Sequence, residues 1–120
     1  MKTEVQIWLN QAYEDLDDAK SIKDQLVHFK SNANKDIPIN RMILFGSRAK
    51  GKTGRDTDAD LIIVSPIFKK MDFFQRGAKM YNYWDLRLPV DFLCYTQEEF
   101  DKLRKKASIV SDAIKEGIEI

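Results

Sequence analysis

The stretch from Ile43 to Val64, ILFGSRAKGKTGRDTDADLIIV, limits the possible folds of this chain more than any other. An apolar run ends in Gly46-Ser47, a basic polar loop follows, and Asp58 and Asp60 then lead into a second apolar run. This order predicts a strand, a turn able to hold a phosphate, a pair of carboxylates and a second strand. Alternate residues of a strand point to the same face, so Asp58 and Asp60 project together if the extended backbone begins by Asp58. Two adjacent carboxylates repel each other unless a cation lies between them, and a metal site is the simplest explanation.

Length and charge restrict the class of ligand. A chain of 120 residues is expected to form one domain, which we take to span residues 1–120. The formal net charge of +1 argues against a general polyanion binder, and we expect no sequence-specific nucleic-acid partner. Residues 37–80 nevertheless contain nine Lys or Arg and four Asp. This local positive field suits a small anion such as a nucleoside triphosphate.

Cysteine and histidine content restricts the metal. The single Cys94 excludes an internal disulfide and a cysteine zinc cluster, and it is best explained as a small apolar filler. The lone His28 is expected at the surface rather than as a ligand. Any metal must then be held by oxygen atoms, which indicates Mg²⁺ or Mn²⁺. We find neither a membrane-length apolar stretch nor a signal-peptide core, so we expect a cytoplasmic protein without membrane contact.

The N-terminal part is predicted to be one long amphipathic helix over residues 4–31. A capping-box pattern at Thr3–Gln6 precedes apolar residues that recur every three or four positions. This apolar stripe is expected to cover the sheet. The alternative is a surface for a partner helix, through which the protein would form a homo- or hetero-oligomer.

The remaining pattern predicts an α+β fold, a short mixed sheet flanked by helices. We expect strands at about 41–45, 59–65 and 90–95, and a helix at about 69–83. On that helix Met71, Phe74, Ala78 and Tyr81 share one side. A capping box at Thr96–Glu99 opens a last helix that breaks near Ser108 and ends at Gly117. Residues 1–36 are thus the first helix and linker, 37–95 the core, and 96–120 a helical part.

Residues 46–53, GSRAKGKT, match the Walker A pattern letter for letter, so a P-loop ATPase has to be considered. A P-loop needs a helix that begins at its Lys-Thr, but a polar, turn-prone segment follows here. The next strand begins about six residues later, too soon for a parallel crossover. A Walker B aspartate also follows its strand, whereas Asp58 and Asp60 precede theirs. The P-loop is therefore the less favoured interpretation of these residues.

The alternative places the phosphates at Gly46-Ser47. Gly46 lets the backbone turn sharply, and Ser47 begins a short helix, about 47–51, whose free N–H groups favour an anion. The Ser47 hydroxyl can donate to a terminal phosphate, and Arg48 is a further predicted contact. Lys50, Lys52 and Arg55 are better explained as a solvated basic loop. The competing explanation is an ordinary strand-to-helix turn with an N-cap serine.

Asp91, between Val90 and Phe92 in the third strand, is the third candidate carboxylate. Its structural explanation is an ion pair with Arg41 or Arg87, because an unpaired charge in a core strand is costly. Its functional explanation is the third ligand of a two-metal site. Asp58 and Asp60 would then bridge two Mg²⁺, while Asp91 would hold one of them and accept the proton of an acceptor hydroxyl.

Together, GSRAKG, DADL and the later VDF resemble the nucleotidyltransferase superfamily typified by DNA polymerase β, and the short form is similar to the minimal nucleotidyltransferases (MNT). Thr57 stands where that family usually has Ser, which keeps the hydroxyl. The resemblance implies Mg²⁺-dependent transfer of NMP, usually AMP from ATP, to a hydroxyl, with release of pyrophosphate. It also implies a HEPN-type toxin as partner and an antitoxin role. The alternative is a binding module that neutralises its partner by contact, with the nucleotide site idle.

Overall fold

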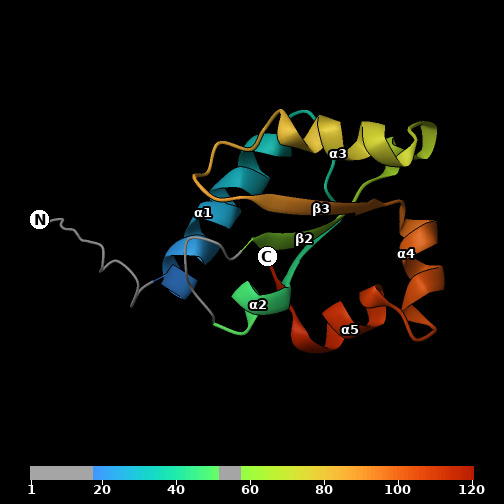
Figure 1. Cartoon of the computed structure of the whole chain (residues 1–120). Coiled ribbons are helices and arrows are strands. Elements are labelled where there is room, and N and C mark those ends of the chain that lie inside the picture. Colours follow the sequence, from blue (N-terminus) through green and yellow to red (C-terminus); the bar gives the residue numbers. More distant parts are fainter. Residues whose placement is uncertain (1–17, 52–57) are drawn as a thin grey trace, which may run out of the picture.

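The computed structural model describes residues 18–51 and 58–120, in which strands are interspersed with helices along the chain (Figure 1). In chain order the elements are α1 (Asp18–Ala33), β1 (Arg41–Phe45), α2 (Gly46–Ala49), β2 (Ala59–Val64), the 3-10 helix η1 (Pro66–Lys70), α3 (Phe73–Tyr81), β3 (Val90–Tyr95), α4 (Gln97–Arg104), α5 (Ile109–Glu116) and β4 (Ile118–Glu119). β1 and β3 have the predicted bounds. The predicted class, α+β with a small mixed sheet between helices, is confirmed.

The described strands form one sheet in the order β3-β2-β1-β4. β1 runs antiparallel to β2 and β4, whereas β2 and β3 are parallel. Residues 65–89, which include η1 and α3, connect the parallel pair, as the length requirement for a parallel crossover demands. The paired registers place Phe45 opposite Asp60, and Asp60 opposite Asp91.

Strand alternation divides the core between the two faces of the sheet. Figure 1 shows α3 on one side of the strands and α5 on the other. One cluster joins the first face to α1, η1 and α3, and its largest fully buried side chains include Leu26, Phe29, Met42, Leu44, Leu61, Ile63, Phe68 and Met80. The second cluster joins the other face to α4 and α5 and contains Ile43, Ile62, Val64, Phe100, Val110 and Ala113. The buried runs of β1 and β2 therefore read as continuously apolar because both faces are covered.

The predicted first helix is described only in its second half. Residues 4–17, and the capping pattern before them, lie outside the described residues. In α1 the apolar stripe (Ile22, Leu26, Phe29 and Ala33) is buried against the sheet, so the core interpretation is confirmed for this part. His28 is exposed, as predicted.

The predicted helix at 69–83 is wrong in its bounds. η1 ends at Lys70, and α3 begins anew because Asp72 accepts from the Gln75 N–H while the Gln75 side chain accepts from the Asp72 N–H. The side predicted to carry Phe74 and Tyr81 is not the buried one. Phe74 is 83% and Tyr81 50% exposed, whereas Met80 is fully buried.

The C-terminal part agrees with the predicted break and adds a strand that was not predicted. Thr96 and Glu99 form the predicted capping box of α4, and Ser108 caps α5. Gly117 ends α5. The two residues of β4 then pair with Ile43 and Leu44 of β1, a strand too short for its sequence pattern to reveal. In the described parts of the chain, no helix combines the length and apolar character needed to cross a membrane.

Candidate active site

The candidate site lies where the C-terminal end of β1 meets the N-terminal ends of β2 and β3. Asp60 pairs in register with Phe45 on one side and with Asp91 on the other. Directly paired residues of neighbouring strands project to the same face, so Asp60 and Asp91 share a face. It is the face covered by α4 and α5, on which Ile62 is buried. Asp58 precedes β2 by one residue and stands two residues before Asp60.

The electrostatics of Asp60 reflect its burial and its two acidic neighbours. Burial, followed by the negative charges of Asp91 and Asp58, raises the pKa of the Asp60 carboxyl above its usual value. Asp58 is half-buried and Asp91 is exposed. Asp60 therefore lies between two like charges in a partly desolvated position, an arrangement that a cation would relieve.

Gly46 brings the main chain into contact with this acidic cluster. Its φ is +75°, a conformation that L side chains rarely adopt. A Cβ atom added here would collide with the Oδ2 atom of Asp60. The turn that opens α2 therefore approaches the carboxylate as closely as glycine alone permits. The next residue, Ser47, is exposed.

The basic residues near the turn are placed differently from one another. Arg48 is buried, with 9% of its surface exposed. Lys50 is exposed and forms an ion pair with Glu116 of α5 at 3.4 Å. Lys52 and Arg55 lie outside the described residues. A phosphate contact by Arg48 stays a prediction.

Asp91 does not have the ion-pair partner considered from the sequence. Arg41 donates instead to both carboxylate oxygens of Glu119, at 3.1 and 2.6 Å. Arg87 is exposed, and within residues 18–51 and 58–120 Asp91 makes no ion pair. The expectation of a buried charge in a core strand is wrong for Asp91, because its side of β3 opens to solvent at this end. Its carboxylate is accessible to a ligand.

A cavity of about 450 Å³ opens beside the carboxylates. Its lining combines Asp60 and Asp91 with the apolar side chains of Phe45, Phe73, Phe92, Leu93 and Ile109. Phe73 at the start of α3 and Ile109 at the start of α5 are 57% and 48% exposed. Neither residue was predicted from the sequence to lie at the site. The signal available for Phe73 was the capping pattern of Asp72–Gln75, which places that ring in the first turn of a helix.

The donor chemistry of the cluster fits a hard divalent cation. All three candidate ligands are carboxylates, which suit Mg²⁺ and Mn²⁺. Burial first, and then the charges of Asp91 and Asp58, raise the pKa of Asp60, and a bound cation would offset both effects. As the side chains stand, no three Asp, Glu, His or Cys in the described part of the chain converge closely enough to enclose an ion. Cys94 is excluded as a ligand because it is buried, and burial raises the pKa of its thiol to about 12.

Comparison with known proteins agrees with this geometry. The crystal structure of a Sulfolobus solfataricus protein proposed to be a nucleotidyltransferase is similar, with a TM-score of 0.63 and 16% sequence identity over 95% of this chain and 90% of that chain. At this identity the likeness shows the fold. No curated protein matches the sequence. The sequence pattern of the nucleotidyltransferase domain matches residues 19–119, and the chain therefore belongs to the nucleotidyltransferase domain family.

Proposed function

We propose that this protein is a metal-dependent enzyme that transfers AMP from ATP to a hydroxyl group of a partner protein. One observation carries the proposal: the Gly46 main chain directly adjoins the Asp60 carboxylate, which shares its face with Asp91. A turn suited to phosphates thus lies beside an acidic cluster suited to cations. Nucleotidyl transfer requires both in one place.

Each residue of the cluster has a proposed role. The Gly46 backbone and the Ser47 hydroxyl bind the terminal phosphates of the nucleotide. Asp58, Asp60 and Asp91 would hold Mg²⁺, and two ions are expected. When bound, Mg²⁺ would neutralise phosphate charge and acidify a nearby hydroxyl. Asp91 accepts the proton of the acceptor hydroxyl. The acceptor oxygen bonds to the α-phosphorus while the bond to the bridging oxygen breaks and pyrophosphate leaves.

The resemblance to minimal nucleotidyltransferases supports a HEPN-type toxin as the partner. Addition of AMP to such a toxin would neutralise it, and the protein would act as its antitoxin. The nucleobase is proposed to be adenine on the same ground.

The direct test is label transfer. The protein is incubated with α-labelled ATP, Mg²⁺ and the candidate toxin, and label on the toxin is measured with time. Asp60→Asn is expected to lower the initial rate at least about 100-fold, because the cluster loses a central ligand. Ser47→Ala is expected to lower it about tenfold, the value of one hydrogen bond. Asp85→Asn, an exposed aspartate outside the cavity, is the matched control and should leave the rate unchanged. Label transfer that survives Asp60→Asn would refute the catalytic role.

A binding module is the second candidate, and the exposed rings of Phe73 and Phe74 favour it. Such a module would neutralise the toxin by contact. Neutralisation that persists in the double variant Asp58→Asn/Asp60→Asn, without any label transfer by the unmodified protein, would establish this alternative.

A further inference from the structure

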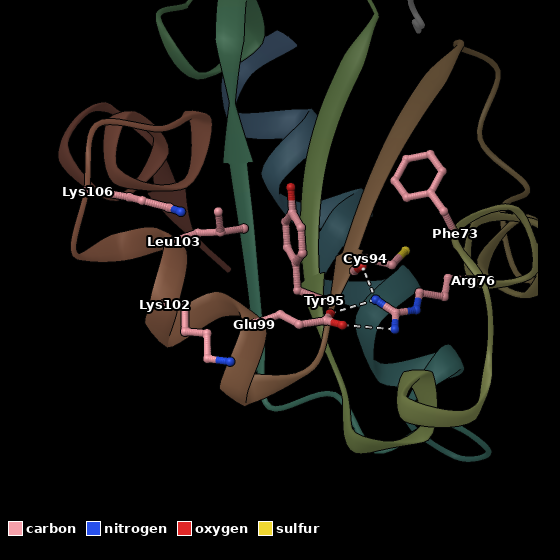
Figure 2. A pocket seen from close by; sticks show the side chains of 8 residues that line it. All are labelled: Phe73, Arg76, Cys94, Tyr95, Glu99, Lys102, Leu103 and Lys106. Carbon is pink, nitrogen blue, oxygen red and sulfur yellow. Dashed lines mark hydrogen bonds and ion pairs between the residues drawn. The ribbon is translucent and has the colours of Figure 1, made fainter.

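A second hollow lies between α3 and α4. Figure 2 shows Tyr95 at its centre, with Phe73 on one side and Leu103 on the other. Its volume is about 360 Å³, enough for one or two side chains. We call this hollow the α3–α4 groove.

The groove continues the cavity of the candidate active site. Phe73 lines both. Along β3, residues 91, 93 and 95 point to the same face, so Asp91 and Leu93 belong to the cavity and Tyr95 to the groove. A ligand lying along this face of β3 would pass directly from the groove to the Asp91 carboxylate.

The strand order indicates which of the two reactants, the nucleotide or the acceptor, would lie along this face of β3. β2 separates β1, which leads into Gly46-Ser47, from β3, which carries Asp91. A nucleotide held by its phosphates at Gly46-Ser47 occupies the β1 side. The β3 side, with the exposed Asp91, is then left to the acceptor.

The walls of the groove are held at a fixed spacing by Arg76 (Figure 2). Its guanidinium donates to both carboxylate oxygens of Glu99, at 2.7 and 3.2 Å, and to the Cys94 carbonyl at 3.1 Å. It also donates to the Met71 carbonyl at 3.0 Å, and its side chain is only 11% exposed. One side chain therefore joins α3, β3 and α4, so the groove is largely preformed.

The same contacts restrict how a ligand can bind. At the outer edge of β3, the Cys94 carbonyl accepts from Arg76 and the Val90 carbonyl accepts from the Tyr81 hydroxyl. These carbonyls are unavailable for an added strand. This favours a ligand that binds through side chains in the groove.

The lining combines an apolar floor with a basic rim. Phe73, Tyr95 and Leu103 supply the apolar surface, whereas Lys102 and Lys106 stand on the α4 side (Figure 2). Both lysines are exposed, and neither forms an ion pair with any residue that the structure describes. The groove thus complements an apolar side chain flanked by negative charge.

We propose that the α3–α4 groove binds the acceptor protein through a segment that presents an apolar side chain next to acidic residues. The inference rests on the proposed function, since it names the acceptor of that site. A polypeptide fits better than a nucleic acid, because the apolar floor of Phe73, Tyr95 and Leu103 matches an apolar side chain, which a phosphate backbone lacks.

Direct binding is measured first, without catalysis. The ¹⁵N-labelled protein is titrated with the synthetic peptide Glu-Glu-Leu-Tyr-Glu-Glu and, separately, with Lys-Lys-Leu-Tyr-Lys-Lys and with oligouridylate. The acidic peptide is expected to shift the amide signals of Phe73, Tyr95 and Leu103, and the basic peptide is not. Equal shifts with both peptides, shifts confined to other surfaces, or tighter binding of oligouridylate would each overturn the proposal.

Charge reversal supplies the second measurement. Lys102→Glu/Lys106→Glu is expected to weaken acidic-peptide binding about tenfold, whereas Lys69→Glu/Lys115→Glu, with the same charge change on η1 and α5, should not. With a toxin that accepts label, Lys102→Glu/Lys106→Glu should raise KM for the toxin about tenfold and leave KM for ATP unchanged. An unchanged KM for the toxin would overturn the assignment.

Failure of the groove and failure of the proposed function are distinguishable. Asp60→Asn should abolish label transfer and retain acidic-peptide binding. If no toxin accepts label while the peptide binds at the groove, the catalytic proposal fails and with it the assignment of the groove to an acceptor. If label is transferred normally by Lys102→Glu/Lys106→Glu, the groove proposal alone fails.

Discussion

At the scale of single residues, the site depends on a glycine that adjoins a carboxylate. Gly46 has a φ of +75°, and a Cβ atom there would meet Asp60. Backbone strain and steric overlap therefore act at the same position. Two other glycines separate these effects, since a Cβ atom added at either would have no neighbour within 4 Å among the described residues. Gly51 has a φ of +82° and isolates backbone strain, whereas Gly77 lies inside α3 and has neither effect.

We therefore predict that Gly46→Ala destabilises the protein by about 1–3 kcal/mol and abolishes label transfer, because Asp60 must move. Gly51→Ala should cost about 1 kcal/mol from strain alone. Gly77→Ala should stabilise by about 0.5–1 kcal/mol, since alanine favours the helix. Urea unfolding of the three variants checks the order. Equal stability of Gly46→Ala and Gly51→Ala would show that the contact with Asp60 has no energetic weight.

Asp60 is expected to lower the free energy of unfolding at neutral pH. Its raised pKa means that the folded protein binds this proton more tightly than the unfolded chain does. The free energy of unfolding therefore falls as pH rises through the Asp60 titration, beginning near the unfolded-state pKa of about 3.9. The proposed metal-binding role of Asp60 and the stability of the fold therefore make opposite demands on this residue.

We predict that Asp60→Asn raises stability at neutral pH, by less than about 1 kcal/mol because solvent screens charges that are this exposed. Mg²⁺ should raise the Tm of the unmodified protein and have little effect on the variant. Thermal unfolding at several pH values and Mg²⁺ concentrations measures both effects. A lower Tm for Asp60→Asn at neutral pH would contradict the repulsion argument.

At the scale of elements, Arg76 and Glu99 join α3 to α4 across the end of β3. The hydrogen bonds from Arg76 lower the pKa of Glu99, against the opposing effect of desolvation. A carboxyl group with a lowered folded-state pKa stabilises the protein above its unfolded-state pKa. This contribution is lost as pH falls through the folded-state pKa.

Arg76→Ala is predicted to cost about 1–3 kcal/mol, because it leaves the Cys94 and Met71 carbonyls without this donor. Glu99→Gln should lower the Tm at neutral pH, and its difference from the unmodified protein should shrink below the unfolded-state pKa of about 4.3. Glu98→Gln, in the same turn of α4, controls for the helix dipole. A Tm difference for Glu99→Gln that does not change with pH would rule out the ion pair as its cause.

At the scale of the whole molecule, the C-terminal strand β4 forms the edge of the sheet beside β1. β4 pairs with β1, the Ile120 N–H donates to the Met42 carbonyl at 2.9 Å, and Glu119 pairs with Arg41 at 2.6 Å. The chain enters β4 at Gly117, where a Cβ atom would lie 2.7 Å from the Leu44 carbonyl oxygen. The connection from α5 to β4 at Gly117 is therefore tightly packed against β1.

Gly117→Ala is predicted to displace β4 and to destabilise the protein by about 1–3 kcal/mol, the usual cost of overpacking. Its φ is not positive, so the effect would be steric. Hydrogen exchange should show lost protection at the Ile120 amide, with Gly77→Ala as control. Unchanged protection of that amide would show that β4 tolerates the side chain.

The amino-acid sequence by itself determined the local features. Periodicity and capping depend on residues only a few positions apart. They therefore predicted the strands at 41–45 and 90–95, the capping box at Thr96, the break at Ser108 and the Gly-Ser turn. Tertiary structure alone decided which distant residues meet. It paired Arg41 with Glu119 rather than Asp91, and it brought Phe73 and Ile109 to the cavity beside Asp60. Such contacts depend on strand order and register, which arise only when the whole sheet assembles between its two layers of helices.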